Sequence, residues 1–116
     1  MRTLLIVNDP PYGTERAYNA LRIANSLLKR EGEEVKVFLM GDAASCAKSG
    51  QTLPDGYYSL ERMLKIFQSK GGETGVCATC MDARGITDDE LAPSTRRSSL
   101  EEVTDWTLWA DKVLVF

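Results

Sequence analysis

Four short runs of mainly apolar residues recur along the chain, and a polar or amphipathic segment separates each run from the next. They cover residues 3–7, 35–40, 73–77 and 112–116. A run of this length that is apolar at nearly every position predicts a strand covered on both faces. The third run, ETGVC, is the least apolar, and its place between two helical patterns is what predicts a strand there.

Apolar residues at helical spacing mark the segments between these runs. We expect Thr14 to cap a first helix, and Ser98 with Glu101 has capping-box spacing for the last one. Thr87 and Glu90 have the same spacing for a brief helix. The expected buried stripes are Ala17, Ala20, Leu21, Ala24 and Leu28 in the first helix, Leu60, Met63, Leu64 and Phe67 in the next long one, and Leu100, Val103, Thr107 and Ala110 in the last.

The alternation of strand and helix patterns predicts an α/β fold in one domain, residues 1–116. It implies a mostly parallel sheet between layers of helices. In such sheets, binding and catalytic residues gather beyond the carboxyl ends of the strands. Asn8-Asp9, Gly41-Asp42 and Cys77 fall at those ends, so we expect a site at this rim of the sheet.

Composition narrows the classes of function. A chain with 43% hydrophobic and 27% charged residues is typical of a soluble globular protein, and its net charge of −3 does not favour binding to nucleic acid or to an anionic membrane. No apolar run is long enough to span a bilayer, and Leu4–Val7 is too short for a signal-peptide core. We therefore expect a cytoplasmic protein with reduced thiols. The chain has no histidine, which excludes a Ser-His or Cys-His dyad and an imidazole-ligated zinc site built from this chain.

Cys77 and Cys80 form a C-x-x-C motif that allows four interpretations. A zinc site would need two further ligands, such as Cys46 and Asp82, and no second C-x-x-C is present, so we expect no metal. The spacing suits a dithiol–disulfide pair, although the residues that follow do not predict a long helix beginning at Cys77. A buried, inert cysteine is the third interpretation, and we prefer it for Cys46. The fourth is a thiol that carries sulfur as a persulfide, with Arg84 as the nearby cation that favours the thiolate.

Four other features bear on the expected site and on its contacts. Arg84 either supports the thiolate or forms a salt bridge with Asp82 or another acid at the rim. The pair Arg96-Arg97 is expected in a solvated loop. Trp109 lies off the inward stripe of the last helix, where it either covers a local groove or anchors a contact between subunits, and we favour the contact. The polar segment 49–57 has the character of a flap over a cleft at the rim.

Several stretches together resemble one known family. They are NDPPYGTERAYNALRIA, FLMGDA, GYYSLERML, VCATCMDARGI and the closing WTLWADKVLVF. In combination they resemble the YchN-like proteins of the DsrE/DsrF group, and the resemblance runs through nearly the whole chain. The C-x-x-C alone would be a weak signal, but its combination with the following DARG and with this terminus is specific.

The resemblance implies a three-layer α/β/α sandwich around a mostly parallel sheet of about five strands. It also implies assembly into homotrimers or homohexamers. In sulfur-relay members of the group, a cysteine at a strand end, followed several residues later by Arg-Gly, carries the persulfide, and Cys77 with Arg84-Gly85 matches that pattern. Cys80 does not match the sulfur carriers, although YchN-like proteins have a second cysteine there.

On this resemblance, the expected catalytic residues are Cys77, Cys80 and Arg84, with no cofactor. The expected partners are other copies of the chain, a sulfur donor such as a cysteine desulfurase, and a downstream sulfur acceptor. Two alternatives stay open. One is a thiol–disulfide redox protein that uses Cys77 and Cys80, and the other is a non-enzymatic oligomer that binds a small ligand at the rim.

Overall fold

Five parallel strands form one sheet at the centre of the protein. The computed structural model describes all residues, 1–116. The strands are β1 (Arg2–Val7), β2 (Glu34–Leu39), β3 (Glu73–Cys77), β4 (Arg96–Ser98) and β5 (Lys112–Val115). Their spatial order is β4-β3-β2-β1-β5, and every neighbouring pair is parallel. The apolar runs therefore locate β1, β2, β3 and β5 to within one residue at each end.

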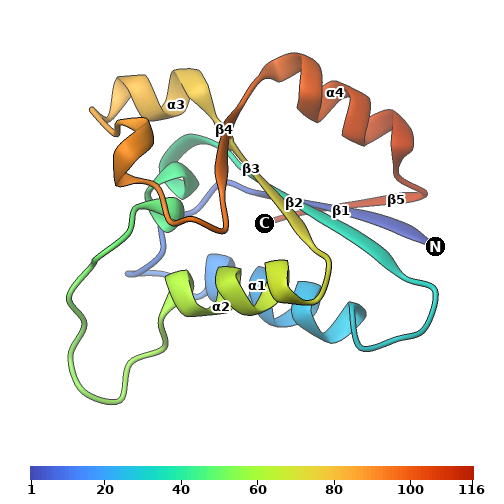
Figure 1. Ribbon diagram of the computed structural model, residues 1–116, viewed down its shortest axis with the longest axis horizontal. Helices are drawn as coiled ribbons and strands as arrows, with labels where there is room; N and C mark the ends of the chain where they lie inside the picture. The colour runs from blue at the N-terminus through green and yellow to red at the C-terminus, as the bar shows by residue number, and fades with distance from the viewer.

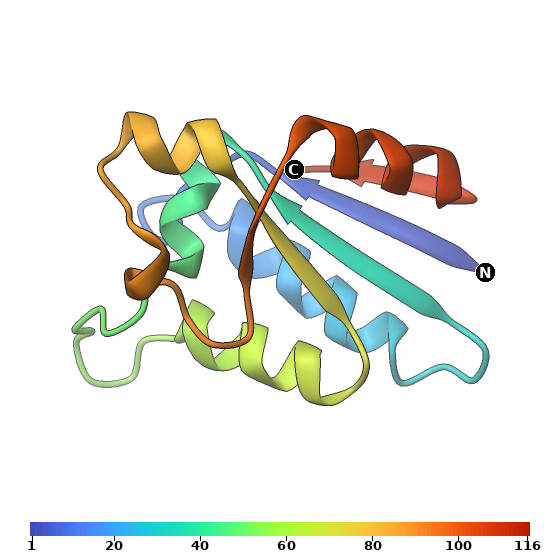
Figure 2. The ribbon, with the colours of Figure 1, turned by 45° about the horizontal axis from the view of Figure 1, so that its top comes forward.

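Helices cover both faces of the sheet, which gives the expected three-layer α/β/α sandwich. The helices α1 (Arg16–Leu27) and α2 (Leu60–Ser69) lie side by side on one face with the 3₁₀-helix η1 (Gly41–Ala47), and α4 (Leu100–Trp109) lies on the other (Figure 1, Figure 2). The short helix α3 (Ala78–Ala83) and the 3₁₀-helix η2 (Asp88–Glu90) connect β3 to β4. None of these helices is both long and apolar enough to cross a membrane.

The two faces of the sheet differ greatly in how much they bury. A cluster of 19 buried residues fills the space between the sheet and α1, α2 and η1. It includes Ala17, Ala20, Leu21 and Ala24 of α1 and Leu60, Leu64 and Phe67 of α2, as the helical patterns predict. On the other face, four residues form the buried cluster: Leu4, Phe38, Val103 and Trp106. Helix α4 is thus the more weakly attached layer.

Two helices begin one residue later than the capping patterns predict. The N-cap of α1 is Glu15 rather than Thr14, and the N-cap of α4 is Ser99 rather than Ser98. The Ser99 hydroxyl accepts the Glu102 backbone N–H at 3.2 Å, whereas Ser98 still belongs to a strand. The buried face of α4 differs accordingly: it consists of Val103 and Trp106, and two residues predicted to point inward, Leu100 and Thr107, are exposed.

The edge strand β4 corrects the prediction of a solvated loop at Arg96-Arg97. Arg96 pairs with Gly75 across the β3–β4 ladder, and its guanidinium lies 2.6 Å from the Glu73 carboxylate. Arg97 binds Asp88 in the segment that leads to this strand, at 2.5 Å. Charged side chains are well tolerated on an edge strand, where they discourage pairing with another chain. A three-residue polar strand has no apolar pattern, so only its pairing with β3 reveals it.

Candidate functional site

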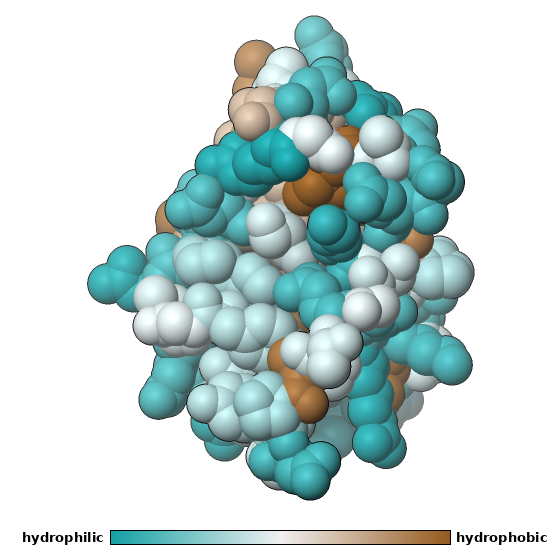
Figure 3. Space-filling view, turned by 90° about the vertical axis from the view of Figure 1, so that its left-hand side faces the viewer, coloured by the Kyte–Doolittle hydropathy of each residue, from teal (hydrophilic) through white to brown (hydrophobic).

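The carboxyl ends of the strands place the C-x-x-C motif at the expected rim. β3 ends at Cys77, while Gly41 begins η1 just beyond β2. Figure 3 looks at this end of the molecule, which is mostly hydrophilic with a few small hydrophobic patches. Cys77 is half-buried and pairs with Ser98 of β4 in the ladder. The structure therefore brings the motif to the edge of the sheet where sites of α/β proteins occur.

The two sulfur atoms of the motif are in direct contact. Cys77 is the N-cap of α3, and Cys80 lies in the first turn of that helix, so their side chains share one side of the turn. The Cys80 thiol donates a hydrogen bond to Cys77 Sγ, with 2.7 Å between the sulfur atoms. The Thr79 hydroxyl lies 3.3 Å from Cys77 Sγ. The helix has only six residues, which agrees with the expectation that no long helix begins at Cys77.

Cys80 Sγ also accepts a hydrogen bond from a backbone N–H just beyond the neighbouring strand β2. The Gly41 N–H donates to Cys80 Sγ at 3.1 Å. Gly41 has a φ of 55°, a left-handed conformation that glycine adopts without a steric cost from a side chain. The turn after β2 can thus aim this N–H at Cys80, which a residue with a side chain would do only under strain.

These contacts make the two thiols unequal. Burial acts to raise the pKa of Cys77, but hydrogen bonds from the Cys80 thiol, the Thr79 hydroxyl and the backbone N–H groups of both residues outweigh it, so this pKa lies below its ordinary value. Burial and the hydrogen bond to Cys77 raise the pKa of Cys80, although the Gly41 N–H acts in the opposite direction. Cys77 is therefore the thiol that ionises first, and Cys80 stays protonated and donates a hydrogen bond to it.

Arg84 occupies the rim but contacts neither sulfur through a hydrogen bond. Its guanidinium lies 2.7 Å from the Asp42 carboxylate and also donates to the Cys80 carbonyl oxygen at 3.1 Å. The salt-bridge interpretation is thus the one that the geometry favours, with Asp42 as the partner, because Asp82 instead binds Arg97 at 3.1 Å. Arg84 ties the turn after β2 to helix α3 and so holds the two parts of the site together.

An apolar groove of about 400 Å³ opens beside the cysteines. Both cysteines line it. The other walls come from three parts of the fold: Phe38 and Met40 at the end of β2, Ala78 and Thr79 after β3, and Leu100 and Val103 on α4. The sequence led us to expect a cleft at the rim but not these lining residues, because a strand buried on both faces gives no alternation to show which side chains face the rim. No residue of segment 49–57 lines the groove, so that segment does not cover it within one chain.

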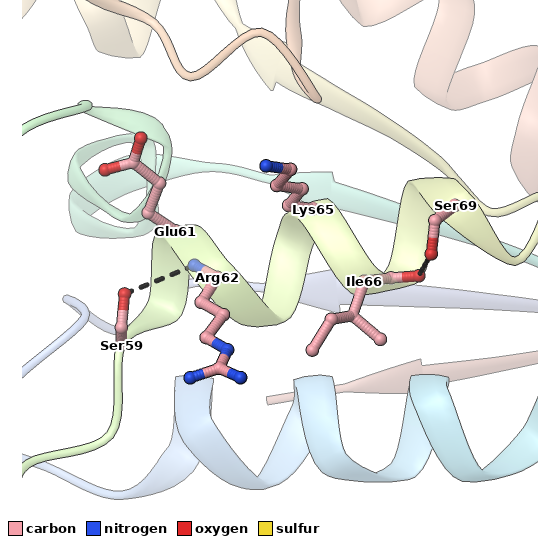
Figure 4. A pocket seen from close by; sticks show the side chains of 6 residues that line it. All are labelled: Ser59, Glu61, Arg62, Lys65, Ile66 and Ser69. Atoms are coloured by element: carbon pink, nitrogen blue, oxygen red, sulfur yellow. Dashed lines mark hydrogen bonds between the residues drawn. The ribbon is translucent and has the colours of Figure 1, made fainter.

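The remaining candidates are the third cysteine, a metal site and a second cavity. Cys46 is fully buried, as we expected, and burial raises its pKa to about 12. No group of three or more cysteine, aspartate or glutamate side chains is placed to hold a metal ion. A larger cavity of about 540 Å³ lies along α2, where Figure 4 shows Arg62 and Ile66 on the side toward α1 and Lys65 on the opposite side. It includes no thiol and is open to solvent on the surface of the helix.

Comparison with known proteins gives a consistent set of relatives. The model of the DsrE/DsrF-like family matches residues 1–116. Protein YchN of Escherichia coli strain K12 is 36% identical over 99% of this chain and 98% of its own length. The crystal structure of the E. coli ychN protein covers 100% of both chains with a TM-score of 0.91 and 38% identity. A TusD sulfurtransferase homolog of Haemophilus influenzae is 26% identical over 88% of this chain and 82% of its own length.

Proposed function

Because this chain belongs to the DsrE/DsrF-like family, we propose that it is a sulfur-relay protein in which Cys77 accepts sulfur as a persulfide. The more distant likeness to sulfurtransferase TusD proteins supports this class of function. A cysteine desulfurase is a suitable donor, and a thiol on a second protein is a suitable acceptor.

The observation that carries the proposal is the environment of Cys77. Its sulfur lies at the end of β3, beside an apolar groove, and its pKa is lowered by hydrogen bonds that outweigh the effect of burial. The thiolate is the nucleophile in exchange reactions of sulfur, so a lowered pKa increases the reactive fraction at neutral pH. The chain has no histidine to act as an adjacent base, so the nucleophile is activated by its lowered pKa instead.

The transfer itself needs only the Cys77 thiolate and the donor persulfide. Cys77 Sγ attacks the outer sulfur of the donor, a new S–S bond forms at Cys77, and the donor's own S–S bond breaks so that its thiolate leaves. An acceptor thiolate then attacks the outer sulfur on Cys77 in the same way. Arg84 acts as a positioning residue here, because its contacts with Asp42 and the Cys80 carbonyl oxygen fix helix α3 against the turn after β2.

Label transfer tests the proposal directly. The protein is incubated with a cysteine desulfurase and sulfur-labelled cysteine, and the label is mapped by mass spectrometry under non-reducing conditions. We expect the label on the peptide that contains Cys77, its loss in Cys77→Ser, and its retention in Cys46→Ala, which removes the buried third thiol. Label that remains in Cys77→Ser, or that never appears in the wild type, refutes the relay.

We also propose that the working form is a homo-oligomer, a trimer or hexamer as the family resemblance implies. Exposed apolar side chains on α4 support a subunit contact there: Leu100 is 70% exposed and Leu108 is 82% exposed. Trp109, the anchor favoured from the sequence, is half-buried, and the Lys36 ammonium lies 4.7 Å from its ring centroid. The contact on α4 is therefore better assigned to the two leucines than to Trp109.

A further inference from the structure

The Cys80 thiol is in contact with the very atom that would be loaded with sulfur. Its Sγ lies 2.7 Å from Cys77 Sγ, and a disulfide bond of about 2.05 Å requires only a modest further approach. The N-cap position of Cys77 and the first-turn position of Cys80 set this contact through local backbone geometry. A pair of thiols held in this way is poised for intramolecular exchange.

Contacts from outside the motif hold Cys80 in its place. The Gly41 N–H donates to Cys80 Sγ at 3.1 Å, and the Arg84 guanidinium donates to the Cys80 carbonyl oxygen at 3.1 Å. The thiolate is the attacking form in exchange, and the Gly41 N–H favours it, although burial and the hydrogen bond to Cys77 keep the pKa of Cys80 above its ordinary value. The third thiol cannot compete for Cys77, because Cys46 is fully buried and its Sγ faces the Asp9 carbonyl oxygen at 3.7 Å.

We propose that Cys80 is a resolving thiol that discharges the Cys77 persulfide as hydrogen sulfide and leaves a Cys77–Cys80 disulfide. This inference rests on the proposed function, since it concerns the fate of the same persulfide. The Cys80 thiolate attacks Cys77 Sγ, the inner sulfur. The bond between Cys77 Sγ and the outer sulfur breaks, and the outer sulfur leaves with the bonding electron pair as hydrosulfide, which takes up a proton.

The electrons balance without an external oxidant. The outer sulfur of the persulfide is reduced to sulfide, the Cys80 sulfur is oxidised from the thiolate to the disulfide level, and the Cys77 sulfur keeps its oxidation level. An external dithiol then reduces the disulfide and restores both thiols. The chain would therefore release sulfide at the expense of a dithiol reductant whenever no acceptor intervenes. The two fates differ in the atom attacked, because an acceptor attacks the outer sulfur and Cys80 attacks the inner one.

A single-turnover experiment with sodium polysulfide as the sulfur source tests this role. Wild type, Cys80→Ser and Cys46→Ala are loaded, desalted rapidly, and followed for sulfide release and for disulfide by peptide mapping. We expect wild type and Cys46→Ala to release sulfide as the Cys77–Cys80 disulfide accumulates, while Cys80→Ser keeps its persulfide until an external thiol is added. Because an intramolecular thiol acts at a high effective concentration, the persulfide should decay at least about tenfold faster in wild type than in Cys80→Ser.

Three results overturn the inference: a wild-type persulfide as long-lived as that of Cys80→Ser, sulfide release without the disulfide, or a Cys80→Ser protein that polysulfide cannot load at Cys77. Cys80→Ala is measured in parallel, and near-ultraviolet circular dichroism verifies that each variant is folded. Polysulfide loads Cys77 without any protein donor. Failure of the desulfurase to label Cys77 would therefore refute the relay alone, and the polysulfide result would still decide the role of Cys80.

Discussion

Replacing Trp106 with alanine should loosen helix α4 selectively, because so few side chains hold this helix to the sheet. Trp106 is 5% exposed, and its ring meets Phe38 edge-on, with 6.0 Å between centroids and 88° between planes. Val103 is the other buried residue of α4. The change removes the larger of the two buried side chains of α4 and leaves the opposite core, around α1 and α2, untouched.

The expected free energies distinguish the opening of α4 alone from the unfolding of the whole protein. Truncating a buried aromatic side chain to alanine costs about 3–5 kcal/mol, whereas a chain of 116 residues is expected to unfold with roughly 6–17 kcal/mol. After the change, Val103 would be the one remaining buried side chain of α4, with about 1.5–3 kcal/mol of apolar burial. The bidentate, partly exposed ion pair between Arg96 and Glu102 adds about 1 kcal/mol or less to this. We therefore expect α4 to open with roughly 2 kcal/mol while the rest of the sheet stays folded.

Native-state hydrogen exchange resolved by peptide measures this opening. Amides of residues 100–109 should lose protection in Trp106→Ala while those of β1 and β2 keep theirs. Phe67→Ala is the matched control, because Phe67 is a fully buried aromatic in the larger core. It should lower the global unfolding free energy without singling out α4. If amides of α4 in Trp106→Ala open with the same free energy as those of β1, the weak attachment of α4 is refuted.

Two further predictions concern reactivity and assembly. The rate of alkylation of Cys77 by iodoacetamide should rise with pH around a midpoint below the ordinary thiol value of about 8.5, because its hydrogen bonds favour the thiolate. Thr79→Val removes one of these bonds and should move the midpoint upward, whereas Thr79→Ser keeps the hydroxyl and should leave the midpoint in place. Cys46 should stay unmodified while the protein is folded. An unchanged midpoint in Thr79→Val would contradict the role of the Thr79 hydroxyl in lowering the pKa of Cys77. Leu108→Glu should leave the single chain folded, as circular dichroism verifies, but shift sedimentation from oligomer to monomer, since Leu108 is 82% exposed in one chain. A wild type that sediments as a 12.9 kDa monomer at micromolar concentration would refute the subunit contact.

Local patterns in the sequence were sufficient for much of the fold. Strands β1 and β2 were found because strands of a covered parallel sheet are apolar over consecutive residues. The same pattern located β5, although β5 is an edge strand on which Val113 and Val115 are exposed, and β3 was located by its place between two helical patterns. The same reasoning missed β4, whose residues Arg96–Ser98 are polar and become a strand only by pairing with Gly75–Cys77. It also placed the start of α4 one residue early, because Ser98 and Ser99 offer the same hydroxyl and only the length of β4 decides between them.

The site, like the fold, combines features that the sequence predicts with features that only the tertiary structure sets. The sequence by itself predicted that Cys77 stands at the end of a strand, with Cys80 three residues further along. The short helix α3, which brings the two sulfur atoms together, is known only from the structure. Only the tertiary structure decided that the Gly41 N–H meets Cys80 and that Arg84 pairs with Asp42 rather than with Asp82. The groove beside the thiols is likewise tertiary, since it joins the end of β2, the turn after β3 and α4. The Gly41–Cys80 and Asp42–Arg84 contacts link residues about forty positions apart, and the order of the strands in the sheet, which no local pattern encodes, brings them together.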